Sequence, residues 1–156
     1  MDKQVQALEY ETMLLTRHSY VNNLRGGPDG SLERSAYILL SRLELDGPLS
    51  IGQLSEAFGL DASTLNRQTS AMMKAHLLQR IPDPDGGVAR KFKITEHGSQ
   101  RLRAVRAVNT AGLAKIVNDW SPDELAAFVT MLVRFNHDIE KLAGRPWPRP
   151  EHAAQL

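Results

Sequence analysis

Residues 50–95 read SIGQLSEAFGLDASTLNRQTSAMMKAHLLQRIPDPDGGVARKFKIT, and this stretch predicts the fold. Ser50 is followed three residues later by Gln53, which is the spacing of a capping box, so a short helix is expected to begin at Ile51. Gly59 suits the left-handed conformation that ends a helix. The stretch therefore opens with a short helix whose beginning and end are both marked in the sequence.

A second helix and a hairpin follow. Asp61 is placed to cap a helix that runs to about Ala75. Leu77–Ile81 and Arg90–Ile94 are predicted as two strands on either side of the turn-rich sequence PDPDGG. Two short helices joined by a tight turn and followed by a β-hairpin are typical of a winged helix-turn-helix. The predicted fold class is mainly α with a small β-hairpin wing.

Amphipathic helices flank this stretch. Apolar residues spaced three and four positions apart predict helices over residues 3–24, 32–45, 95–119 and 122–143. The tail, residues 144–156, has three prolines at alternate positions and is expected to be extended or disordered. We predict a single domain, with a winged helix-turn-helix lobe at residues 32–94, flanking helices at residues 1–25 and 95–143, and the tail.

Composition excludes several classes of protein. With 42% hydrophobic and 24% charged residues, the chain has the composition of an ordinary globular domain, and no apolar run approaches a membrane span. There is no cysteine, which excludes disulfides, thiolate metal sites and thiol redox sensing. The N-terminal sequence MDKQVQALEYE lacks the apolar core of a signal peptide, so a cytoplasmic protein is expected.

Positive charge gathers around the helix-turn-helix. The net charge is only +1, but residues 61–93 hold six Lys or Arg and three Asp, a local excess of +3. Such a face is a modest footprint for phosphate, although an ordinary solvated surface gives the same count.

The second helix of the motif has two distinct faces. Helical spacing turns an apolar set inward: Leu65, Thr69, Met72 and Leu77. The outward set offers hydroxyl, amide and cationic groups that suit base edges and phosphates: Ser63, Thr64, Asn66, Arg67, Ser70 and Lys74. We predict that this face contacts DNA; a solvated helix face is the alternative.

Catalytic and metal patterns were sought without success. The five histidines are scattered, and neither a HExxH motif nor a nucleotide-binding glycine loop occurs. His137 and Asp138 lie near Glu140, but this group is a weak zinc candidate. We therefore predict no enzyme activity, no metal and no cofactor.

Three motifs in order resemble the MarR family of bacterial transcription regulators. They are DASTLNR at residues 61–67, QRIPDPD at residues 79–85 and ITEHG at residues 94–98, and the resemblance covers roughly residues 3–143. It implies that the residue at Arg67 contacts DNA and that both terminal helices pack in a two-fold homodimer. Trp147 would either add to that interface or be a lone exposed aromatic residue.

The sequence departs from the family at two places. His76 stands at the helix exit where the family often has glycine, and it is expected to cap that helix. At the wing tip, residues 86–88 read Gly-Gly-Val where the family usually carries an arginine, and two glycines predict a flexible tip. Arg90 and Lys91 are the nearest substitutes, and alternation along the strand makes Lys91 the better-placed phosphate partner.

The resemblance also implies a small aromatic or phenolic effector. The residues that would line its pocket are Arg17, His18, Tyr37 and Asn109. The predicted function is that of a dimeric, sequence-specific DNA-binding transcription regulator, a repressor that responds to a ligand and recognises a pseudo-palindromic operator. The alternative is a winged-helix interaction module that binds protein or RNA.

Overall fold

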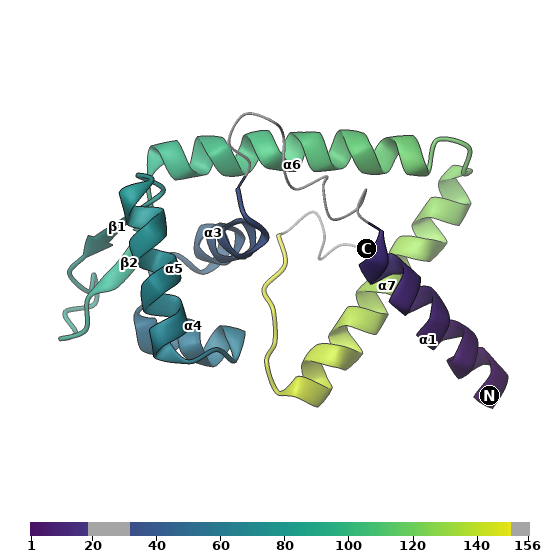
Figure 1. Cartoon of the computed structure of the whole chain (residues 1–156), viewed down its shortest axis with the longest axis horizontal. Coiled ribbons are helices and arrows are strands. Elements are labelled where there is room, and N and C mark those ends of the chain that lie inside the picture. Colours follow the sequence, from purple (N-terminus) through teal and green to yellow (C-terminus); the bar gives the residue numbers. More distant parts are fainter. Residues whose placement is uncertain (19–31, 151–156) are drawn as a thin grey trace.

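The computed structural model describes residues 1–18 and 32–150 (Figure 1). Within them the helices are α1 (Asp2–Arg17), α3 (Arg34–Asp46), α4 (Ile51–Phe58), α5 (Ala62–Lys74), α6 (Glu96–Ile116) and α7 (Pro122–Ala143). A two-stranded antiparallel sheet, β1 (Leu78–Ile81) and β2 (Lys91–Ile94), forms the wing. The predicted fold class is confirmed. No described helix is both long enough and apolar enough to cross a membrane.

The helix-turn-helix begins and ends where the sequence predicts. The Ser50 hydroxyl accepts a hydrogen bond from the Gln53 N–H at 3.2 Å, and the Gln53 side chain accepts from the Ser50 N–H at 2.9 Å. Gly59 has a φ of 63°, in the left-handed region. Asp61 caps α5 by accepting from the Thr64 N–H at 2.7 Å. The capping box and the α5 cap are therefore confirmed.

One hydrophobic core unites α3, α4, α5, the hairpin and the start of α6. The phenyl ring of Phe92, in β2, is 1% exposed. The backbone of Phe92 also bonds to Leu49, because the Leu49 N–H donates to the Phe92 carbonyl at 3.2 Å and the Phe92 N–H donates back at 2.8 Å. Leu49 follows Gly47 and Pro48, a pair that is typical of the end of a helix. The sequence therefore did not predict that Leu49 pairs with β2 through an isolated β-bridge. It ties the segment that leads into α4 to the wing.

The exit from α5 is a Schellman motif with histidine at the left-handed position. The Leu77 N–H donates to the Met72 carbonyl at 2.9 Å, and the His76 N–H donates to the Met73 carbonyl at 3.0 Å. His76 has a φ of 58°, the only positive value at a non-glycine residue in the described chain. Its carbonyl accepts the Thr95 hydroxyl at 2.6 Å. The helix ends at the predicted place, and His76 contributes through its left-handed backbone; the interaction of its side chain with the helix dipole stays a prediction.

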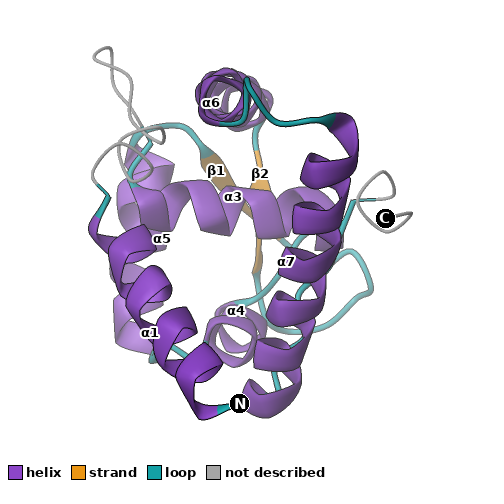
Figure 2. Ribbon diagram, turned by 90° about the vertical axis from the view of Figure 1, so that its right-hand side faces the viewer, coloured by secondary structure: helices purple, strands orange, loops and turns teal. Residues whose placement is uncertain are grey.

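Two long helices extend away from the lobe. α6 is anchored in the core by Leu102 and Val105 and then runs past the lobe along the top of Figure 1. α7 starts at a capping box between Ser121 and Glu124, as predicted, and descends from the far end of α6. Neither α7 nor α1 contains a buried residue. Figure 2 shows α1 and α7 as two separate rods in front of the lobe.

The two ends of the chain differ from expectation. α1 ends at Arg17, and the remainder of the helix predicted over residues 3–24 lies outside the described residues from 19 on. The described part of the tail is extended but not free, because residues 145–150 turn back and pack on the lobe. Trp147 is half-buried against Phe58 of the same chain, so it is not a lone exposed aromatic residue.

Candidate DNA-binding surface

The core holds α5 in one orientation. Leu65, Thr69 and Met72 are buried, as predicted, and the Thr69 hydroxyl is satisfied by donating to the Leu65 carbonyl at 2.8 Å. The opposite face carries the predicted contact residues, of which Thr64 is partly buried and the others are exposed: Ser63, Asn66, Arg67, Ser70 and Lys74. Six side chains able to bond to DNA thus share one helix face.

The start of α5 is fixed by Asp61. Its carboxylate accepts the Ser63 hydroxyl at 2.6 Å and the Thr64 N–H at 2.7 Å, and these bonds lower the pKa of Asp61 to about 2. Asp61 is therefore ionised at neutral pH. The hydroxyl proton of Ser63 is donated to Asp61. The Ser63 oxygen can therefore only accept a further hydrogen bond, for example from a base amino group in the major groove.

The wing tip requires a correction. The Lys91 ammonium lies 3.1 Å from an Asp83 carboxylate oxygen and 3.9 Å from Asp85, and its side chain is mostly covered. The expectation that Lys91 presents a free charge to phosphate does not fit this pairing. The Asp85 N–H donates to the Asp83 side chain at 2.9 Å, and the Gly86 N–H donates to the Asp83 carbonyl at 3.0 Å. Asp83 therefore orders a tip that two glycines had predicted to be flexible.

The bonds to Asp83 act on its ionisation. The Asp85 N–H, followed by the Lys91 side chain, lowers the pKa of the Asp83 carboxyl. It is thus an anion that holds the turn and neutralises a strand cation at the same time. The pair places a negative charge beside Lys91, which weakens the attraction of this lysine for a phosphate.

Arg80 is a wing cation that the sequence reasoning did not select. Arg80 pairs with Phe92 across the two strands, and its guanidinium lies 5.2 Å from the centre of the Phe92 ring. Arg90 is exposed and donates to the Arg80 carbonyl at 3.4 Å. The register of the hairpin, which places Arg80 opposite Phe92, is the sequence feature that could have predicted this contact. Among the described residues from 50 to 94, five cations have no carboxylate partner: Arg67, Lys74, Arg80, Arg90 and Lys93.

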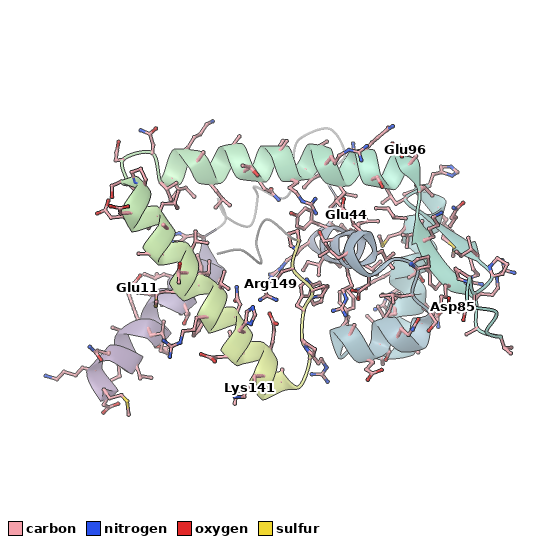
Figure 3. All side chains as sticks on the ribbon, turned by 180° about the vertical axis from the view of Figure 1, so that it is seen from behind. Glu11, Glu44, Asp85, Glu96, Lys141 and Arg149 are labelled. Carbon is pink, nitrogen blue, oxygen red and sulfur yellow. The ribbon has the colours of Figure 1, made fainter. Side chains whose placement is uncertain are left out.

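Two of the four predicted effector residues, Tyr37 and Asn109, lie on α3 and α6. Tyr37 of α3 and Glu44 both hydrogen-bond to Arg106 of α6, with the Glu44 carboxylate 2.9 Å from the guanidinium (Figure 3). Asn109 lies one helical turn beyond Arg106, and its side-chain oxygen is buried with no partner among the described residues. The other two predicted residues, Arg17 and His18, are exposed at the end of α1.

A cavity of about 420 Å³ lies instead between α3, the inner side of α5 and the start of α6. None of the four predicted residues lines it. It is bounded mostly by apolar side chains with polar groups from α5 and α6: Leu32, Glu33, Ser35, Ala36, Gln68, Ala71, Met72, Ala75, Leu77, His97 and Arg101. Its size suits a small organic molecule.

The described residues contain no cluster of three or more groups able to hold a metal. Glu140, a member of the weak zinc candidate, is bonded to Arg149 at 2.5 Å.

A winged helix-turn-helix with a polar, exposed second helix and unpaired cations on its wing defines a DNA-binding protein. Residues 32–86 match the sequence pattern of the MarR family. YxaD from Bacillus subtilis (strain 168), described as an uncharacterised HTH-type transcriptional regulator, is 35% identical over 132 residues, which cover 85% of this chain and 92% of YxaD. The chain belongs to the MarR family of transcription regulators, a family whose members are generally not enzymes.

Solved structures share this fold over most of the chain. A MarR family protein from Bacillus stearothermophilus gives a TM-score of 0.76 at 20% identity, over 89% of this chain and 97% of that protein. A mutant of MarR from E. coli, complexed with operator DNA, gives 0.61 at 14% identity over 83% and 91%. PcaV from Streptomyces coelicolor, in complex with its natural ligand, gives 0.59 at 21% identity over 82% and 89%.

Proposed function

We propose that this DNA-binding regulator is a homodimeric repressor that binds a pseudo-palindromic operator and is released by a small aromatic acid or phenol. The observation that carries the dimer is an apolar surface left open along three helices. On α7 the exposed apolar residues follow helical spacing: Leu125, Phe128, Leu132, Phe135, Ile139 and Leu142. α1 adds Val5, Leu8 and Leu15, and the far half of α6 adds Val108, Leu113 and Ile116.

Monomeric proteins rarely leave so much contiguous apolar surface in water. A second copy of the same surface, related by a two-fold axis, would cover it. Such a dimer presents two α5 helices, and their outward faces would read two half-sites in successive major grooves. A bound dimer would also occupy a promoter in place of the polymerase, and for this reason we propose repression.

The cavity between α3, α5 and α6 is the proposed effector site. It lies against the inner side of α5, so a molecule inside it would act on the helix that reads DNA. Arg101 and His97 offer donors to a carboxylate or phenolate, and Met72 and Leu77 offer apolar contact to a ring. The Tyr37–Asn109 region is the second candidate, since the buried Asn109 oxygen lacks a donor among the described residues.

One experiment tests the DNA and dimer parts together. Sequences bound by the purified protein are selected from a random duplex pool, and the mass of the complex is measured. The proposal predicts a palindromic consensus occupied by two chains. A consensus of one unrepeated half-site bound by a single chain would overturn the dimer, and failure to enrich any sequence would overturn operator recognition.

The effector part needs a separate test. Benzoates and hydroxybenzoates are titrated into the protein–operator complex, with Arg101→Ala and Asn109→Ala as the variants. Release by a ligand that fails on Arg101→Ala alone places the site in the cavity, whereas failure on Asn109→Ala alone places it at the second candidate.

A further inference from the structure

Residues 145–150 connect the end of α7 to the DNA-binding lobe, and we call them the strap. In Figure 1 the strap rises from the lower end of α7 to α3. Figure 3 shows the same region from behind, with Arg149 between α7 and the lobe. α6, α7 and the strap thus form three sides of a triangle that begins and ends at the lobe.

Trp147 anchors the strap on the lobe. Its ring meets the ring of Phe58, the last residue of α4, edge to face, with centroids 5.2 Å apart and an interplanar angle of 85°. The guanidinium of Arg42, from α3, lies 4.8 Å from the Trp147 ring centre and donates to the Pro146 carbonyl at 3.4 Å. Arg42 is itself held by Asp46 at 2.5 Å. The strap therefore contacts both α3 and α4.

The backbone of Trp147 is bonded to α7. The Trp147 N–H donates to a carboxylate oxygen of Glu140 at 3.1 Å. Arg149 donates to both oxygens of that carboxylate, at 3.1 and 2.5 Å, and to the Trp147 carbonyl at 2.5 Å. Because these side chains are mostly covered, the ion pair is less screened than a surface pair. Trp147 is thus joined to the lobe through its ring and to α7 through its backbone.

The strap is stiff for its length. Pro146, Pro148 and Pro150 each fix a backbone φ angle, and each proline also restricts the residue before it to extended conformations. An alternating proline segment behaves as a short rod, so little conformational entropy remains to be lost when it docks. A rod of this kind transmits the position of one end to the other.

The strap restricts the movement of the lobe relative to α7. Without it, α7 reaches the lobe only through the turn at its start and the length of α6, since α7 buries no residue of its own. A single connection of this kind allows the lobe to swing relative to α7. A second attachment at the opposite end of α7 closes the triangle and removes that freedom.

We propose that the strap sets the distance and angle between the two DNA-binding lobes of the dimer, with Trp147 and Arg149 as positioning residues that determine which half-site spacing is accepted. This inference rests on the proposed dimeric function. One added base pair separates half-sites by about 3.4 Å and rotates one by about 35° around the duplex. A braced dimer discriminates against such a change, whereas lobes that swing freely accommodate it.

The first test measures binding to the selected operator and to versions with one base pair inserted or removed between the half-sites. Trp147→Ala removes the anchor on the lobe, and Arg149→Ala removes the bond to α7 while leaving the ring in place. Trp147→Ala should reduce the discrimination between spacings by about tenfold, the scale of one aromatic pair and one cation–π contact. Arg149→Ala should change the discrimination in the same direction, because it loosens the other end of the strap. Trp147→Phe keeps a ring beside Phe58 and Arg42 and should retain most of the discrimination.

The second test needs no DNA and uses the absence of cysteine from the chain. Gln79, which is exposed on β1, is changed to cysteine and spin-labelled. The distance between the two labels of a dimer is then measured by pulsed electron paramagnetic resonance. The wild-type strap should give a narrow distribution. Trp147→Ala and Arg149→Ala should broaden it. The charge-exchanged pair Glu140→Arg with Arg149→Glu should narrow it only in part, because it restores the ion pair but not the bonds to the Trp147 backbone.

The outcomes separate the strap from the dimer. If the labels show no dipolar coupling, the chain is not a dimer, and the proposed function fails together with the strap's role. If the wild type couples and prefers one spacing, but both alanine variants keep the same distribution and the same preference, the dimer stands and the strap inference is overturned. Equal weakening of binding at every spacing, with an unchanged distribution, also overturns it, because a merely destabilised lobe would behave in that way.

Discussion

Val88→Arg should add a DNA contact at the tip of the wing. Val88 is fully exposed at the end of the hairpin, so a longer side chain meets no steric obstacle. Each phosphate contact steepens the dependence of log K on log salt by about 0.9, so two subunits of Val88→Arg add about 1.8. When the salt concentration rises fourfold, the affinity of Val88→Arg for DNA should therefore fall by about ten times more than the affinity of the wild type.

The neighbouring glycine supplies a control with the same added charge. A Cβ atom at Gly87 would clash with the Asp83 carboxylate, which holds both the Asp85 N–H and Lys91. Gly87→Arg must therefore displace Asp83 and disturb the turn. We expect Gly87→Arg to lower stability and to gain less affinity than Val88→Arg.

The assay is fluorescence anisotropy of labelled operator and random duplexes between about 50 and 200 mM salt. Val88→Gln, of similar length but uncharged, should keep the wild-type slope. If Val88→Arg also kept that slope, the wing tip would not approach the DNA backbone and the proposed docking of the lobe would be wrong. A gain confined to one DNA sequence would show base reading in place of phosphate contact.

Three further predictions follow from individual side chains. Arg67→Ala should weaken operator binding by about 1–3 kcal/mol with an unchanged melting temperature, and equal affinity in a gel-shift titration would remove Arg67 from the contact face. His76→Gly should stabilise the protein by about 0.5–1 kcal/mol, because relief of about 1–2 kcal/mol of left-handed strain exceeds the entropy that glycine adds to the unfolded chain. Urea unfolding at one fixed protein concentration measures this change, and His76→Ala should bring no such gain. The Arg149 bond lowers the pKa of Glu140 below its ordinary 4.5, so the ionised carboxylate contributes stability above that pH and loses it as the pH falls through the folded-state pKa. Glu140→Gln should therefore flatten the acid side of the stability profile in urea titrations, and an unchanged profile would contradict the role of this ion pair.

Local signals allowed the sequence to predict most of the lobe. Ser50, Asp61 and Ser121 each bond to a backbone N–H three residues away, so short sequence windows contain the whole interaction. The inward and outward faces of α5 follow from helical periodicity in the same way. The predicted strands differ from β1 and β2 by one residue each, at the N-terminal end of each strand.

Contacts between distant residues were decided only by the tertiary structure. Asp83 and Lys91 both had visible charges, but alternation along β2 did not reveal that the turn would bring them to 3.1 Å. The signs of two charges do not specify their separation, so the pairing of Lys91 was not predicted. The bridge between Leu49 and Phe92 was hidden for the same reason, since each residue satisfies a backbone partner far away in sequence.

The tail shows the difference most clearly. Its alternate prolines determined that residues 145–150 are extended, because proline fixes φ whatever surrounds it. They did not determine where the segment goes. Trp147 docks on Phe58 and Arg42 only because α6 and α7 bring the chain back to the lobe, across 104 positions between Arg42 and Pro146. Conformation is a property of the local backbone, whereas docking depends on surfaces that exist only after the lobe and both helices have packed.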